Sequence, residues 1–137
     1  MEKNNNFPDI SDKILQELSQ AAWVARDKAI IFGNTKVGVA LYTDDQKIFT
    51  GCNVEQIFRI NDVHAEVNAI SNMVTAGYKH FYVILIAAKR KKFTPCGSCM
   101  DWIMQFGGPN CTVAFQSNTS AEIITYRAKE IMPLYPE

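Results

Sequence analysis

Two short segments of this chain contain residue types that bind metal ions and transfer protons. The first is His64-Ala65-Glu66, and the second, Pro95-Cys96-Gly97-Ser98-Cys99, follows 28 residues later. Two thiolates and one imidazole suit zinc, which prefers sulfur and nitrogen ligands. Three protein ligands leave the fourth tetrahedral position for a water molecule, as is typical of a catalytic zinc site. The predicted ligands are therefore His64, Cys96 and Cys99.

Each segment lies at the start of a predicted helix. Because Cys96 and Cys99 are three positions apart, they face the same way on a helix, and the helix N-terminus favours their thiolate form. His64 and Glu66 are only two positions apart and do not face each other. Glu66 can therefore stay off the metal and act as a general base.

Hydrophobic patterning predicts the elements that must position these segments. A helix begins at Ser11 or Asp12 and ends near Gly33, and a final helix covers 121–129. Between them we expect a hairpin of strands at 37–43 and 47–54, a helix over 64–76, a buried strand at 81–88, a helix over 96–106 and a strand at 111–115. This order indicates a mixed sheet with helices packed on its faces.

Composition and charge exclude several classes of protein. The 137 residues are 47% hydrophobic and 20% charged, which is typical of a single globular domain. Fourteen basic and fourteen acidic residues balance, so bulk binding to nucleic acid is disfavoured. The run Lys89-Arg90-Lys91-Lys92 is either a solvated loop or a contact for a phosphate.

We expect a cytoplasmic protein that does not enter a membrane. No stretch of about 18 apolar residues occurs, and residues 1–10 form a polar tail without the pattern of a secretory signal. The four cysteines are then expected to be reduced thiols. Cys96-Gly-Ser-Cys99 also resembles a thiol redox motif, although that alternative leaves His64 and Glu66 unexplained.

A His-x-Glu segment followed by Pro-Cys-x-x-Cys is a known signature of zinc-dependent base deaminases. With this signature, the chain resembles the small cytidine deaminase family, which includes the blasticidin S deaminases. The resemblance extends to three further segments in the family's order, Val37-Gly38-Val39-Ala40-Leu41, Gly51-Cys52-Asn53-Val54-Glu55 and Glu130-Ile131-Met132-Pro133-Leu134-Tyr135. It covers essentially the whole chain.

The resemblance implies a single domain over 1–137 with the three-layer α/β/α fold of cytidine deaminases, a mixed five-stranded sheet and one zinc ion per chain. It also implies hydrolytic deamination at C4 of a cytosine-type nucleoside in pyrimidine salvage, with Glu66 as the proton shuttle. The backbone N–H of Ala65 would bind the ring carbonyl, and the backbone C=O of Thr94 would bind the amino group. Asn53 and Glu55 match the residues that bind the ribose.

Family members of this length are similar in being homotetramers with shared sites. We therefore expect a homo-oligomer, a tetramer or a dimer, in which Tyr135 either closes a neighbouring subunit's pocket or is simply a buried terminal aromatic residue.

Departures from the family pattern cluster around the expected substrate. Thr35-Lys36 replaces the Phe-Pro pair whose ring stacks on the pyrimidine. We expect Phe32 to be a core residue, with substitution for that ring as the alternative. The next departure is the segment Gln56-Ile57-Phe58-Arg59-Ile60. Phe58 either stacks on the substrate or packs in the protein. Arg59 either binds a carboxylate or phosphate or forms a surface salt bridge.

These departures indicate retained chemistry with altered specificity. A blasticidin S deaminase-like enzyme acting on a larger cytosine nucleoside is the main alternative. A polynucleotide-editing deaminase would have the same ligands, but the neutral charge balance argues against it. A non-catalytic zinc-binding module would also have them, but it would leave Glu66 without a role.

Overall fold

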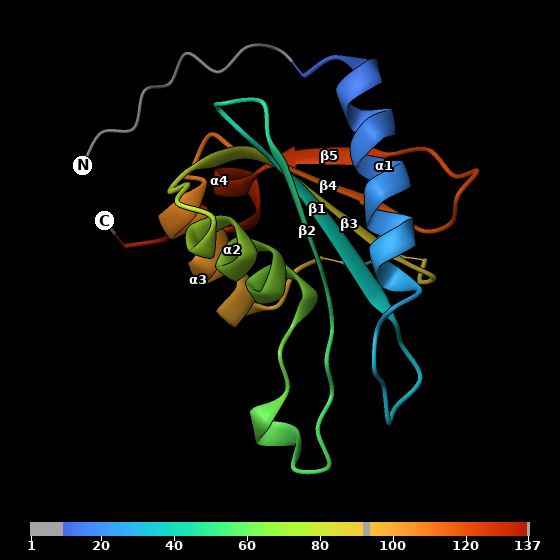
Figure 1. Ribbon diagram of the computed structural model, residues 1–137. Helices are drawn as coiled ribbons and strands as arrows, with labels where there is room; N and C mark the ends of the chain where they lie inside the picture. Colours follow the sequence, from blue (N-terminus) through green and yellow to red (C-terminus); the bar gives the residue numbers. More distant parts are fainter. Residues whose placement is uncertain (1–9, 92–93, 137) are drawn as a thin grey trace.

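A computed structural model of the chain describes residues 10–91 and 94–136. Within these residues, one five-stranded sheet has helices packed on both faces (Figure 1). The helices are α1 (Asp12–Arg26), α2 (Ala65–Thr75), α3 (Gly97–Phe106) and α4 (Ala128–Ile131), and a short 3-10 helix covers Arg59–Asn61. The strands are β1 (Val37–Thr43), β2 (Ile48–Cys52), β3 (Phe81–Ala88), β4 (Thr112–Gln116) and β5 (Ile124–Arg127). The expected α/β architecture with a mixed five-stranded sheet is confirmed.

The strands lie in the order β2-β1-β3-β4-β5. β1 is antiparallel to β2 and β3, and β4 is antiparallel to β5. β3 and β4 are parallel, so the chain must cross back between them, and it does so through α3. As a result, α3 begins beyond the carboxyl end of β3, where α/β proteins commonly bind ligands.

The two central strands separate two layers of the core. β1 and β3 are buried along their whole length, and alternate residues of β1, and of β3 from Val83 to Ala88, face opposite layers. In β3, Ile84 and Ile86 pack with α2, α3 and α4, whereas Val83 and Leu85 pack with α1. Figure 1 shows the same arrangement, with α1 alone on one side of the sheet. We call these sides the α2/α3 face and the α1 face.

A glycine allows α2 to lie close to the sheet. A Cβ atom added at Gly51 of β2 would lie 2.4 Å from the backbone nitrogen of Ala69 and 2.6 Å from the backbone oxygen of Ala65. Real Cβ atoms do not approach other atoms this closely, so only glycine fits. Because Ala65 opens α2, this contact sets the position of the residues at the start of that helix.

Two expected elements differ in the structure. The predicted helix over 121–129 is wrong: Ile124–Arg127 forms β5, paired with β4, and the helix begins only at Ala128. Ile, Thr and Tyr in this segment favour a strand once a partner edge is available. α1 ends at Arg26 rather than near Gly33, and Ile30 instead forms a bridge to Val54.

Over residues 10–91 and 94–136, no helix is long and apolar enough to cross a membrane. Most of the polar segment expected at 1–10, and Lys92 of the basic run, lie outside the described residues.

We predict that Gly51→Ala destabilises the protein, because the added methyl group meets backbone atoms of α2 that cannot move independently. Overpacking of this kind lowers the free energy of unfolding by about 1–3 kcal/mol. Gly33→Ala is the matched control, since its added Cβ would lie 3.6 Å from its nearest neighbour, an ordinary contact. Chemical denaturation measures both, and equal stabilities of the two variants would contradict the role of Gly51.

Candidate zinc site and its surroundings

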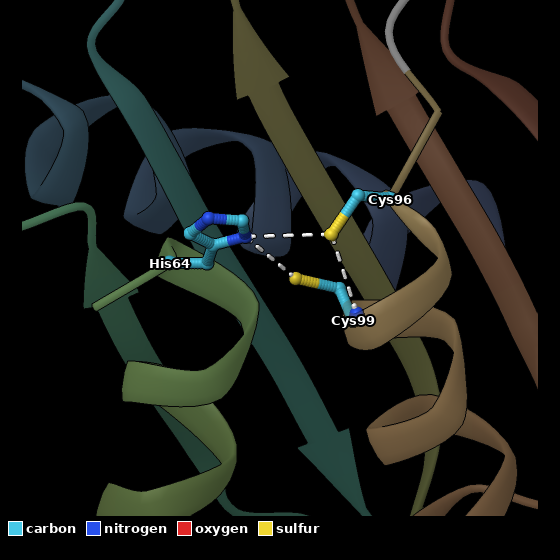
Figure 2. Close-up of side chains that lie close together, drawn as sticks. All are labelled: His64, Cys96 and Cys99. Atoms are coloured by element: carbon cyan, nitrogen blue, oxygen red, sulfur yellow. Dashed lines mark hydrogen bonds between the residues drawn. The ribbon is translucent and has the colours of Figure 1, made fainter. Parts of the chain in front are cut away.

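Three side chains predicted as metal ligands lie together at the starts of α2 and α3. The candidate ligand atoms of His64, Cys96 and Cys99 all lie within 4.8 Å of one another. His64 Nδ1 is 3.1 Å from Cys99 Sγ and 3.5 Å from Cys96 Sγ (Figure 2). His64 and Cys96 are exposed and Cys99 is buried, so the cluster is accessible from one side.

The spacing of these atoms fits a tetrahedral zinc ion. Zinc bonds of about 2.3 Å to sulfur and 2.0–2.1 Å to nitrogen place neighbouring ligand atoms about 3.6 Å apart. The two nitrogen–sulfur distances, 3.1 Å and 3.5 Å, are both shorter than this value, so a small outward shift of the side chains would accommodate the ion. With two sulfurs and one nitrogen, the donor set is also one that zinc prefers. His64, Cys96 and Cys99 therefore form a candidate zinc site.

Both cysteines are placed by the first turn of α3. Cys96 is the N-cap residue, and its sulfur accepts a hydrogen bond from the backbone N–H of Cys99 at 3.4 Å. Burial raises the pKa of the Cys99 thiol, and the nearby Glu66 carboxylate raises it further. A cation at the three ligands would oppose this effect, because metal binding displaces thiol protons.

Glu66 lies beside the cluster in a dry environment. It is only 3% exposed, and burial raises the pKa of its carboxyl group. Hydrogen bonds from its own backbone N–H and from the Cys99 thiol, together with the charge of His64, oppose that rise. A buried carboxyl group with a raised pKa accepts and releases a proton at a pH closer to neutral than an exposed carboxyl group does.

The side chain of Asn53 holds the start of β1 in place. Its Oδ1 accepts a hydrogen bond from the backbone N–H of Val37 at 2.8 Å, and its Nδ2 donates to the backbone oxygen of Thr35 at 2.9 Å. Asn53 is 9% exposed. Its amide can form up to four hydrogen bonds, so these two do not exhaust its capacity.

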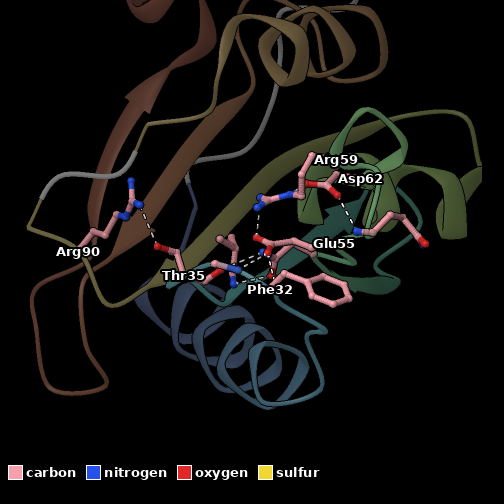
Figure 3. A network of polar contacts seen from close by, with 10 residues as sticks. Phe32, Thr35, Glu55, Arg59, Asp62 and Arg90 are labelled. Atoms are coloured by element: carbon pink, nitrogen blue, oxygen red, sulfur yellow. Dashed lines mark hydrogen bonds and ion pairs between the residues drawn. The ribbon is translucent and has the colours of Figure 1, made fainter.

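The carboxylate of Glu55 is held by groups from two loops (Figure 3). It accepts hydrogen bonds from the backbone N–H groups of Phe32 and Gly33 and lies 3.2 Å from the guanidinium of Arg59. Arg59 also pairs with Asp62 at 2.7 Å. The Gly33 and Phe32 N–H groups are the main cause of a lowered pKa for Glu55, with Arg59 adding to it, so this group is a carboxylate at neutral pH.

The other expected substrate residues are Ala65, Thr94 and Tyr135. Ala65, buried at the first position of α2, separates His64 from Glu66. Thr94 is exposed and precedes the Pro-Cys segment by one position. The hydroxyl of Tyr135 donates a hydrogen bond to Asp101 of α3, and its ring packs against the core on the α2/α3 face.

Two aromatic residues are more exposed than a core position allows. Phe32 was expected in the core, but it is 61% exposed, so this expectation is wrong. Its backbone is held by Glu55 while its ring lies outside the packed layers. Phe58 is 75% exposed, which excludes ordinary packing within this chain. Arg59 does form the salt bridge that was one of its two expected roles.

Two asparagines that were not predicted from the sequence join α2 to β2 through hydrogen bonds between their side chains and backbone groups. Asn68 accepts a hydrogen bond from the backbone N–H of Cys52, and Asn72 donates one to the backbone oxygen of Thr50. The only sequence signal for these contacts is the presence of two asparagines four positions apart in a helix interior. Asparagine disfavours helices, so its presence there indicates that the side chain forms a hydrogen bond outside the helix.

A groove of about 610 Å³ lies between α1, β2 and α2. Its lining includes Val24, Ile48 and Asn72 but none of the candidate zinc ligands. The chemistry therefore has to be sought at the ligand cluster and not at this groove.

Comparison with known proteins gives an independent test of this site. Residues 12–115 match the family model described as the cytidine and deoxycytidylate deaminase zinc-binding region. The chain is 38% identical over 78 residues to a probable cytidine deaminase of Dictyostelium discoideum, a match that covers 56% of this chain and 53% of that protein. It is 27% identical over 111 residues to a cytidine deaminase of Sporosarcina psychrophila, covering 80% and 81% of the two chains.

Solved structures agree with the sequence matches. The crystal structure of cytidine deaminase from Burkholderia pseudomallei superposes with a TM-score of 0.81 at 30% identity, covering 91% of this chain and 98% of that one. The matched family region contains all three candidate ligands and Glu66. On this evidence the chain belongs to the cytidine deaminase family, a family of zinc-dependent hydrolases.

Proposed function

We propose that this protein catalyses the zinc-dependent hydrolytic deamination of a cytosine nucleoside, such as cytidine or deoxycytidine, to the uracil nucleoside and ammonia. The main support is the position of Glu66, buried beside three converging zinc ligands without being one of them. A non-catalytic zinc module or a redox dithiol has no use for a carboxyl group in this position. The role follows from the site's chemistry together with family membership.

In this proposal the protein supplies proton transfer and orientation. A zinc ion held by His64, Cys96 and Cys99 would act as a Lewis acid that activates a water molecule. Glu66 takes one proton from that water and delivers it to the ring nitrogen next to C4. It then takes the second proton from the hydroxyl group formed at C4 and delivers it to the amino group, which leaves as ammonia while the C4 carbonyl forms. Its burial supports this role, because a desolvated carboxyl group exchanges protons closer to neutral pH than an exposed one.

Backbone groups and two polar side chains orient the substrate in this proposal. The N–H of Ala65, at the start of α2, donates to the ring carbonyl, and the C=O of Thr94 accepts from the amino group that leaves. Asn53 and Glu55 bind the sugar hydroxyls. Both follow the end of β2 within three residues, and both are fixed by backbone groups at the start of β1 or in the loop that leads into it. Such fixed groups lose little freedom when a substrate binds.

We also propose that the protein acts in pyrimidine salvage as a homo-oligomer, a tetramer or a dimer. The segment around the 3-10 helix exposes Ile57, Phe58 and Ile60 by 77%, 75% and 93%. Exposed apolar residues in one segment favour association with another protein surface. In such an oligomer we propose that Tyr135 and Phe58 help form the pocket of a neighbouring chain.

The first prediction concerns the metal. Cys99→Ala removes one of three zinc ligands, so zinc content should fall from about one equivalent per chain to less than about 0.2, and activity should be lost. Cys111→Ala is the matched control, because Cys111 is also a buried cysteine but lies outside the cluster. Elemental analysis of both purified variants checks this, and full zinc occupancy in Cys99→Ala would show that the ligand assignment is wrong.

The second prediction concerns proton transfer. In Glu66→Gln, the glutamine side chain has nearly the same volume as glutamate but cannot accept a proton. Zinc should therefore stay bound, while kcat should fall by about 10²-fold to 10⁴-fold. Zinc analysis and an ammonia-release assay on the same preparation separate these two effects. If this variant turned over substrate at a near-normal rate, Glu66 would not be the base.

The third prediction concerns the substrate. Ammonia release should be measured with cytosine, cytidine, deoxycytidine, modified cytidines and blasticidin S. We expect the nucleosides to give a kcat/KM at least about tenfold higher than cytosine, because only nucleosides can contact Asn53 and Glu55. A clear preference for blasticidin S would establish the alternative of a deaminase for a larger cytosine nucleoside, and a preference for free cytosine would remove Asn53 and Glu55 from substrate binding.

A further inference from the structure

Arg59 lies in the loop between β2 and α2, in the segment 56–60 where the sequence departs from the family pattern. We propose that Arg59 is a positioning residue for sugar recognition: it holds the carboxylate of Glu55 in the orientation that accepts a hydrogen bond from a hydroxyl group of the substrate. This proposal rests on the proposed deaminase function, and it makes the sugar specificity of that function depend on a residue outside the family pattern.

Two backbone hydrogen bonds fix one oxygen of the Glu55 carboxylate. Its Oε1 atom accepts from the N–H of Phe32 at 2.7 Å and from the N–H of Gly33 at 2.8 Å. A carboxylate oxygen has two lone-pair positions, so both positions of Oε1 are used. These bonds hold one atom and leave the carboxylate able to turn about it. The direction of Oε2 therefore depends on another contact.

Arg59 provides that contact. Its Nη2 atom lies 3.2 Å from the Oε2 atom of Glu55, and its Nε atom donates to Asp62 Oδ2 at 2.7 Å (Figure 3). Because guanidinium is planar and rigid, the bond at Nε also sets the direction of Nη2. One lone-pair position of Oε2 then faces Arg59, and the other can accept a hydrogen bond from one hydroxyl group.

Asp62 gives Arg59 a fixed anchor. The Oδ1 atom of Asp62 accepts a hydrogen bond from the N–H of Gln56 at 2.6 Å. The next residue, Val63, exchanges two backbone hydrogen bonds of 2.9 Å with Val54, which closes this loop into a hairpin. Arg59 is therefore bonded to a carboxylate that the backbone of its own loop holds in place.

The exposure of the three side chains fits a functional contact better than a structural one. The side chains of Glu55 and Asp62 are 10% and 14% exposed, whereas that of Arg59 is 55% exposed. An exposed salt bridge of this kind contributes little to stability, because solvent screens it. Two negative carboxylates and one positive guanidinium also leave the cluster negative, which favours a hydroxyl donor over an anion at Oε2.

A loop contact without a role in sugar recognition predicts a different outcome from the one proposed. Loosening the hairpin would lower activity by the same factor for every substrate. Loosening Glu55 would lower it only for substrates with a hydroxyl group on the sugar ring. A ratio between two substrates distinguishes these outcomes. The compound 2′,3′-dideoxycytidine is the reference, because it keeps the base and the sugar ring but lacks both hydroxyl groups on that ring.

The test measures kcat/KM for cytidine relative to 2′,3′-dideoxycytidine. In wild-type protein we expect a ratio of at least about tenfold, the contribution of a hydrogen bond to a charged acceptor. Arg59→Gln should lower this ratio by about threefold to tenfold, because Glu55 must then be ordered when the sugar binds. The kcat/KM for dideoxycytidine and the zinc content should stay within about twofold of wild type. Arg59→Lys should give an intermediate ratio, since it keeps the charge but not the rigid fork.

Lys28→Gln is the matched control, because it removes one positive charge from an exposed position in the loop that leads from α1 to β1. Its ratio should equal that of wild type. In Glu55→Gln, the further change Arg59→Gln should leave the ratio unaltered, because Arg59 acts through this carboxylate. An unchanged or raised ratio in Arg59→Gln, an equal fall in Lys28→Gln, or a further fall in the double variant would each overturn the proposal.

A binding measurement distinguishes failure of this proposal from failure of the proposed function. Calorimetric titration of zinc-loaded Glu66→Gln with cytidine and with 2′,3′-dideoxycytidine reports affinity without turnover. If no substrate releases ammonia, the deaminase function fails, yet a preference for cytidine that falls in Glu66→Gln/Arg59→Gln still supports the role of Arg59. Equal affinity for the two compounds, or binding of neither, would overturn that role whatever the activity.

Discussion

The convergence of two helix N-termini at one edge of the sheet is the constraint on which the rest of this site depends. His64 precedes α2 and Cys96 precedes α3, and 31 residues separate them in the chain. Their side chains meet only because both helices pack on the same face of β1 and β3. The parallel pairing of β3 with β4 makes α3 a crossover helix, and Gly51 lets α2 approach β2 closely. The position of the candidate zinc ligands thus depends on the sheet topology and on the absence of a side chain at Gly51.

The same packing explains why one carboxyl group in this region is suited to proton transfer and another to holding a fixed charge. Glu66 lies inside the α2/α3 layer, where desolvation favours its neutral form. Glu55 lies in a loop, where two backbone N–H groups and Arg59 favour its ionised form. The local environment therefore shifts the pKa values of two glutamates in opposite directions, and neither shift can be predicted from residue type alone.

The sequence predicted the zinc site because its information is local. Cys96 and Cys99 are one helical turn apart, His64 and Glu66 are neighbours, and spacing alone indicates which of them share a face. The interior strand at 81–88 was equally clear, since a continuous apolar run has few alternatives. The segment 121–129 failed because its strand forms only against the edge of β4. The contacts among Thr35, Asn53 and Arg90 could not be predicted, since they join three segments that are far apart in the sequence, through the backbone oxygen and the hydroxyl group of Thr35.

Asn68 and Asn72 have a consequence beyond holding α2 in place. β2 is the outermost strand on its side of the sheet, and such a strand ordinarily presents a row of unpaired amide and carbonyl groups. The two asparagines occupy the N–H of Cys52 and the C=O of Thr50, the groups that an incoming strand from another molecule would need. α2 therefore shields this border against intermolecular strand addition. The helix that carries Glu66 therefore also keeps these two backbone groups of the outer strand from pairing with a second molecule.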